Sequence, residues 1–78
     1  MISSEQIKSA RALLGISSKE LAELAGVGWA TIRRFENLPG IPEHRNGNLD
    51  KVRSALEARG IEFLGDPIAS PGVRLHKK

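Results

Sequence analysis

Two adjacent arginines, Arg33 and Arg34, are the side chains with the clearest capacity for chemistry in this chain. A guanidinium group presents a planar fork of N–H donors that fits guanine O6 and N7, or a phosphate group. Arginines on an exposed helix face are also common on ordinary solvated surfaces, so the pair alone does not indicate a function. The elements that would position these two side chains decide between the two interpretations.

The segment 18–37 predicts two short helices joined by a tight turn at residues 26–28. Gly26 can adopt the positive φ that such a turn requires. Ile32 and Phe35 lie three residues apart on the second helix and are expected to face inward together. The side chains that then remain on its outward face are those of Trp29, Ala30, Arg33 and Arg34.

Two helices are predicted before the turn, over residues 4–14 and 18–25. A capping box opens each of them, as Ser-x-x-Gln from Ser3 and as Ser-x-x-Glu from Ser17. A glycine, which can adopt the left-handed conformation that ends a helix, follows each one. The same start and stop signals therefore occur twice in succession.

The third helix is expected to begin near Gly28 or Trp29 and to end within residues 37–40, where a proline restricts the chain. After a loop, Asn48 is expected to cap a fourth helix that Gly60 ends. The first sixty residues thus predict four short helices.

The remaining residues predict a small β-hairpin. Residues 61–64 and 73–75 alternate apolar and polar side chains, as half-exposed strands do, across the turn-rich segment 65–72. The expected fold class is mostly α, with four short helices and a C-terminal β-hairpin. We expect a helix-turn-helix domain over residues 1–60, followed by a hairpin extension and basic tail over residues 61–78.

Several functions are excluded by composition. The chain has 78 residues and no cysteine, so disulfides and thiolate metal sites are absent. Its two histidines, His44 and His76, have no partner at metal-ligand spacing. The sequence contains no glycine-rich phosphate loop and no clear Ser-His-acid set. We therefore expect no enzyme activity, no cofactor and no metal.

The charge and hydropathy patterns add weaker constraints. Twelve Lys and Arg against nine Asp and Glu give a net charge of +3, which is compatible with nucleic acid without demonstrating it. No apolar run approaches the roughly 20 residues of a membrane span. The first residues lack the layout of a signal peptide. We expect a soluble cytoplasmic protein.

Taken in register, these features resemble the helix-turn-helix domains of lambdoid phage repressors and Cro proteins, known as the XRE type. The resemblance covers residues 3–60, and these matching positions carry it: Ala22, Gly26, Val27, Ile32, Phe35, Glu36 and Asn37. It implies that the third helix enters the DNA major groove while the second crosses the backbone. It also implies an ion pair between Arg11 and Glu36.

The resemblance gives a set of expected DNA contacts. Arg34 and Ala30 are expected to read bases, and Thr31 and Arg33 to lie nearer the backbone. The amides at Ser17 and Ser18 could bind a phosphate. The full expected set is Ser17, Ser18, Gly28, Trp29, Ala30, Thr31, Arg33, Arg34, Asn37, Arg45 and Asn46.

Two positions depart from the family pattern. Ser18 stands where a longer glutamine is common, and Trp29 stands where a small or polar residue is usual. Trp29 either presses its ring on DNA or covers the hydrophobic core, and the sequence favours neither. A protein-binding module, either an antitoxin with a toxin partner or an adaptor, is the alternative to a DNA-binding regulator.

A single helix-turn-helix covers only a few base pairs, so we expect a repressor that binds double-stranded DNA as a homodimer on a palindromic operator. An isolated hairpin is marginal in water and must pack on something. The apolar strand residues Ile61, Phe63, Val73 and Leu75 are the expected dimer contacts.

Overall fold

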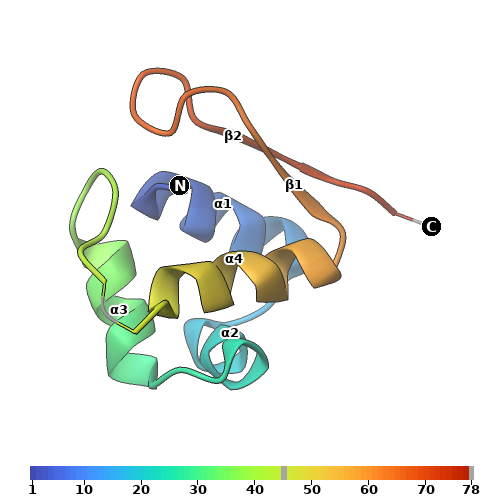
Figure 1. The fold of residues 1–78 in the computed structure, drawn as a ribbon. Coiled ribbons are helices and arrows are strands. Elements are labelled where there is room, and N and C mark those ends of the chain that lie inside the picture. Colours follow the sequence, from blue (N-terminus) through green and yellow to red (C-terminus); the bar gives the residue numbers. More distant parts are fainter. Residues whose placement is uncertain (45, 78) are drawn as a thin grey trace.

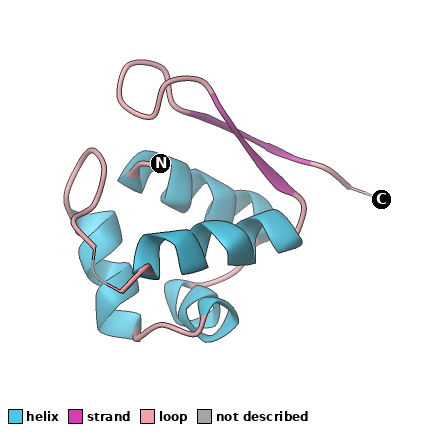
Figure 2. Cartoon of the chain, in the orientation of Figure 1, coloured by secondary structure: helices cyan, strands magenta, loops and turns pink. Residues whose placement is uncertain are grey.

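The computed structural model of the chain describes residues 1–44 and 46–77. Four helices, α1 (Ser4–Leu14), α2 (Ser18–Ala25), α3 (Trp29–Asn37) and α4 (Asn48–Ala58), are followed by the strands β1 (Ile61–Leu64) and β2 (Gly72–Leu75). The hairpin lies across the helices (Figures 1 and 2). The predicted fold class, four helices with a C-terminal hairpin, is confirmed. None of the described helices is long and apolar enough to cross a membrane.

The first two helices begin as the sequence predicts. At α1, the backbone amide of Gln6 donates to Ser3 Oγ at 3.2 Å, and the backbone amide of Ser3 donates to Gln6 Oε1 at 3.0 Å. At α2, the Glu20 amide donates to Ser17 Oγ at 3.1 Å, and the Ser17 amide donates to Glu20 Oε1 at 3.0 Å. Both capping boxes thus satisfy donors that the helix itself leaves unpaired.

The last two helices begin at glycines instead. Gly28 precedes α3 and Gly47 precedes α4, and within the described residues neither helix has a side-chain cap. The prediction that Asn48 caps α4 is wrong, because Asn48 is already the first residue of the helix. Asn46 and Gly47 both have positive φ, 56° and 70°. This backbone turn makes Gly47 the N-cap, one residue before the predicted position.

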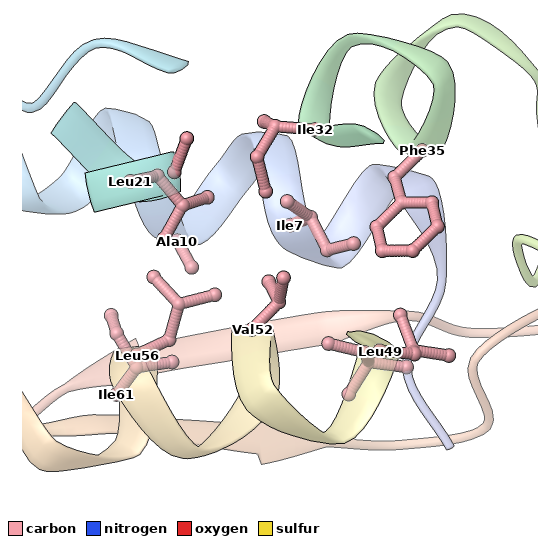
Figure 3. Packing of buried hydrophobic residues seen from close by; sticks show 11 residues of the cluster. Ile7, Ala10, Leu21, Ile32, Phe35, Leu49, Val52, Leu56 and Ile61 are labelled. Atoms are coloured by element: carbon pink, nitrogen blue, oxygen red, sulfur yellow. The ribbon is translucent and has the colours of Figure 1, made fainter. Parts of the chain in front are cut away.

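All four helices and β1 contribute to one hydrophobic core (Figure 3). Ile7 of α1, Leu21 of α2, Ile32 of α3 and Val52 of α4 are each fully buried. Every buried side-chain nitrogen or oxygen in the described residues has a hydrogen-bond partner. The core therefore fixes the orientation of α3 from its inner face and leaves the outer face to solvent.

The hairpin is part of this core. The two strands are antiparallel, with Ile61 opposite Leu75 and Phe63 opposite Val73. Ile61 belongs to the buried cluster, and the other three side chains pack against it. Gln6, at the start of α1, donates from Nε2 to the carbonyls of Leu64 and Gly72, at 3.2 and 3.1 Å. The hairpin is thus supported by the helices of its own chain.

Candidate nucleic-acid interface

The turn between α2 and α3 has the geometry of a helix-turn-helix. Gly26 ends α2 with φ at 70°, a conformation that glycine adopts at little cost. The Val27 amide then donates back to the Ala22 carbonyl at 3.1 Å, which closes the last turn of α2. Val27 packs against the core, and α3 begins two residues later. The short connection holds α3 across α2 (Figure 1).

An ion pair ties the end of α3 to α1. Arg11 donates to both carboxylate oxygens of Glu36, from Nε to Oε2 and from Nη2 to Oε1, at 2.9 Å each. Arg11 Nη1 also donates to the Ile16 carbonyl at 3.2 Å. The Glu36 side chain is only 9% exposed and that of Arg11 is 27% exposed. This is the pair that the sequence led us to expect, in the bidentate geometry that gives arginine–carboxylate pairs their strength.

Ser4 holds the same end of α3 through backbone contacts. Its hydroxyl donates to the Glu36 carbonyl at 3.2 Å, and its amide donates to the Gly40 carbonyl at 2.8 Å. Ser4 is fully buried. Sequence reasoning missed this role, because a serine just after a helix cap carries no signal of a contact thirty residues away.

The outward face of α3 carries the side chains that the sequence places there. Trp29, Ala30, Arg33 and Arg34 are exposed, and Thr31 is half-buried. The Arg33 guanidinium lies over the Trp29 ring, 5.3 Å from its centre. Arg34 lies over the Phe35 ring at 5.6 Å. Among the described residues, neither arginine forms an ion pair with a carboxylate. Their charges therefore remain available to an anion.

The capping box at the start of α2 conflicts with one of the expected phosphate contacts. The Ser17 amide is not free for a phosphate, because it already donates to the Glu20 carboxylate. That carboxylate also adds a negative charge at this helix start. Ser18 Oγ accepts a hydrogen bond from Trp29 Nε1 at 2.9 Å, so this hydroxyl contacts α3. The expectation that both serine amides are free is therefore wrong for Ser17.

Three of the other expected contact residues lie within the described residues. Gly28 immediately precedes the helix, and Asn37 is its exposed last residue. Asn46 is exposed in the loop before α4. Arg45, also expected to contact the DNA backbone, lies outside the described residues. The structure thus brings Ser18, Gly28 and Trp29 together at one end of α3 and leaves Asn37 at the other.

The expected dimer residues contact the core of their own chain. Ile61 is only 3% exposed, within the core of its own chain. Phe63, Val73 and Leu75 are partly buried against that core. Burial corrects the expectation for Ile61, whose side chain is enclosed by its own chain. A dimer contact through the partly buried side chains of Phe63, Val73 and Leu75 stays a prediction.

The two packed helices, their tight turn and the solvent-facing arginines define a helix-turn-helix DNA-binding unit. Residues 7–43 match the family model described as Helix-turn-helix (HTH_3). These residues form a helix-turn-helix domain of the XRE, Cro and C1 type. The family implies sequence-specific DNA binding in transcriptional regulation, and it is not an enzyme family. No curated protein matches the chain.

Proposed function

We propose that the protein is a transcriptional repressor that binds a palindromic operator as a dimer, with α3 in the major groove. The observation that carries this proposal is the contrast between the two faces of α3. Ile32 and Phe35 fix its inner face in the core, whereas Arg33 and Arg34 stand exposed and free of carboxylate partners among the described residues. A rigid helix that presents unpaired arginines fits base and phosphate recognition.

The first residues of α3 face the base edges in this arrangement. Ala30 is small and lets the helix approach the bases, and Arg34 offers two parallel donors to a guanine. Arg33 and Thr31 lie nearer the phosphate backbone. The uncapped start of α3 adds backbone amides and the positive end of the helix dipole, both of which favour a phosphate.

A dimer supplies the specificity that one short helix lacks, since two copies about 34 Å apart read two half-sites. The strand edges support pairing between copies. His76 donates its amide to the Gly60 carbonyl at 2.8 Å, and hydrogen-bonded pairs alternate along antiparallel strands. The backbone groups of Phe63 and Val73 therefore point away from the partner strand. Each outer edge offers these groups to the strand of a second copy.

In the first experiment, a duplex is selected from a random-sequence pool and titrated with the protein. Binding is measured by fluorescence anisotropy at a series of salt concentrations. We expect two chains per duplex and an affinity that falls steeply with salt. Arg34→Ala should weaken binding at least about tenfold and relax the preference at one base pair in each half-site.

Arg59→Ala is the matched control, because Arg59 is an exposed arginine at the end of α4 that lies away from α3 (Figure 1). We expect this variant to bind within about twofold of the wild type, the loss of one distant surface charge being largely screened. Equal effects of the two variants, with no preferred duplex, would contradict the proposal and favour the protein-binding adaptor. One chain per duplex would contradict the dimer alone.

A further inference from the structure

Trp29 combines exposure with two specific contacts. Its side chain is 48% exposed although it is the largest in the chain. Its indole N–H donates to Ser18 Oγ at 2.9 Å, and its ring lies under the Arg33 guanidinium at 5.3 Å. Trp29 and Ser18 are the first residues of α3 and α2. One side chain thus connects the starts of both helices and an arginine of the outward face.

The start of α3 has few other restraints. Gly28 gives it no side-chain cap among the described residues, and the turn before it is short and contains two glycines. The first α3 side chain that reaches the core is that of Ile32, nearly one turn further on. Val27, in the turn, packs against the core. The hydrogen bond from Trp29 to Ser18 adds a side-chain link between the first residue of α3 and the first residue of α2.

The same indole orders Arg33. Residues four apart lie on the same side of a helix, so the guanidinium of Arg33 reaches the face of the Trp29 ring. Stacking uses the flat face of the guanidinium and leaves its in-plane N–H donors free. An arginine already held in place loses less conformational freedom when it binds than one that is free to rotate.

We propose that Trp29 is a positioning residue for DNA binding, which holds the start of α3 against α2 and holds Arg33 ready to bind a backbone phosphate. This inference rests on the proposed DNA-binding function. It assigns Trp29 a role that acts through Arg33. It also explains why Trp29 is exposed, since a side chain that only covered the core would be buried.

The test is a pair of double-mutant cycles with the selected duplex, read by anisotropy. Trp29→Ala should weaken binding by about two- to tenfold, which is the range expected when one long side chain must be ordered on binding. In the Arg33→Ala background, the same change should cost only the factor that Trp29→Phe loses, because the arginine that the ring holds is gone. In the Arg34→Ala background, which serves as the matched control, the full factor should persist.

Further readouts separate positioning from a purely structural role. Trp29→Ala should leave the melting temperature nearly unchanged, since the side chain is half-exposed. Arg33→Ala should reduce the slope of log Kd against log salt by about two per duplex, because each of the two copies loses one phosphate contact. Trp29→Phe keeps a ring beneath Arg33 and lacks the N–H donor. It should therefore match Ser18→Ala, and these two variants measure the part of the effect that comes from the helix start. If the alanine variant does not fold, Trp29→Leu, which lacks the ring, replaces it in both cycles.

Each outcome is decisive. Coupling of Trp29 to Arg33 with none to Arg34 supports the inference. Equal factors in both arginine backgrounds, or wild-type affinity of Trp29→Ala, overturn it while the proposed function stands. A random pool that yields no preferred duplex contradicts the proposed function, and the role of Trp29 falls with it.

Discussion

The two ends of α3 are held in different ways. At its last turn, Glu36 is nearly buried and bound by Arg11 of α1, and its carbonyl accepts from the buried Ser4. At its first residue, the contact is an exposed hydrogen bond between Trp29 and Ser18, and Gly28 provides no cap. One end is thus fixed by buried charge, and the other by a contact that solvent reaches.

The difference suggests a division within one helix, in which the last turn stabilises the fold and the first turn is accessible to a ligand. The contacts at the last turn are shielded from water, so they add to the free energy of unfolding whether or not DNA is present. At the first turn, the Thr31 amide donates to the Gly28 carbonyl, while those of Trp29 and Ala30 have no partner among the described residues. Unpaired amides and the positive end of the helix dipole are what an anion-binding helix start requires. Changes at the two ends should therefore affect different measurements.

The largest effect is expected at the last turn. Glu36→Ala leaves Arg11 partly buried without its partner, and it should lower the free energy of unfolding by about 2 kcal/mol. Glu57→Ala is the control, because it breaks the Arg53–Glu57 pair, whose side chains are 42% and 45% exposed. That change should cost no more than about 0.5 kcal/mol. Urea denaturation of both variants checks this, and equal losses would show that burial of the Glu36 pair adds nothing.

The next effect is expected at the first turn. Gly28 has φ at −69°, and an added Cβ would meet only Thr31 Oγ1, at 3.8 Å, so a larger residue fits. Gly28→Asp should cap α3 yet weaken binding to the selected duplex about tenfold, because a carboxylate then faces the phosphates. Gly28→Asn is the uncharged control. If the two variants bind equally well in low salt, the start of α3 does not face DNA.

The smallest effect is expected in the loop of the hairpin. Hydrogen bonds from the amides of Ala69 and Ile68 hold the pKa of Asp66 below its ordinary value of 3.8. Because the folded pKa is lowered, this stabilisation is complete above pH 3.8 and is lost as the pH falls through the folded value.

The two amide proton signals should shift in this acidic range, as followed by nuclear magnetic resonance. They should not shift in Asp66→Asn, which cannot titrate. A shift of the same amides in that variant would mean that another group titrates. Signals from the first turn of α3 should stay constant in this range, which would set the loop apart from that turn.

The local part of the fold could be predicted from the sequence. Capping boxes and helix-ending glycines act within a few residues, so α1 and α2 have the predicted bounds. The start of α4 could not be predicted in the same way, since Asn46 and Gly47 turn the chain by their backbone conformation. A polar residue such as Asn48 therefore predicts that a helix begins nearby, but it does not predict which residue is the N-cap.

Contacts between distant segments were harder to predict. The pair between Arg11 and Glu36 came from the family resemblance, because nothing in the spacing of two residues 25 apart indicates it. The bond of Trp29 to Ser18 was not foreseen. The bond of the Ser17 amide to Glu20 belongs to the predicted capping box, and it makes that amide unavailable for the phosphate that the resemblance assigned to it. Ile61 was expected at a dimer surface but is buried in its own chain. The alternation of a strand indicates which residues share a face, but it does not indicate what covers that face.

Gln6 has a consequence for how the chain folds. Its side-chain oxygen, Oε1, accepts a hydrogen bond from the Ser3 amide at the start of α1. Its side-chain nitrogen, Nε2, donates to two carbonyls of the hairpin, 58 and 66 residues further along. Contacts of such separation form late, because a long loop must close before they are gained. The first and last elements of the domain should therefore order together in the final step of folding, and a hairpin that opens should also loosen the beginning of the first helix.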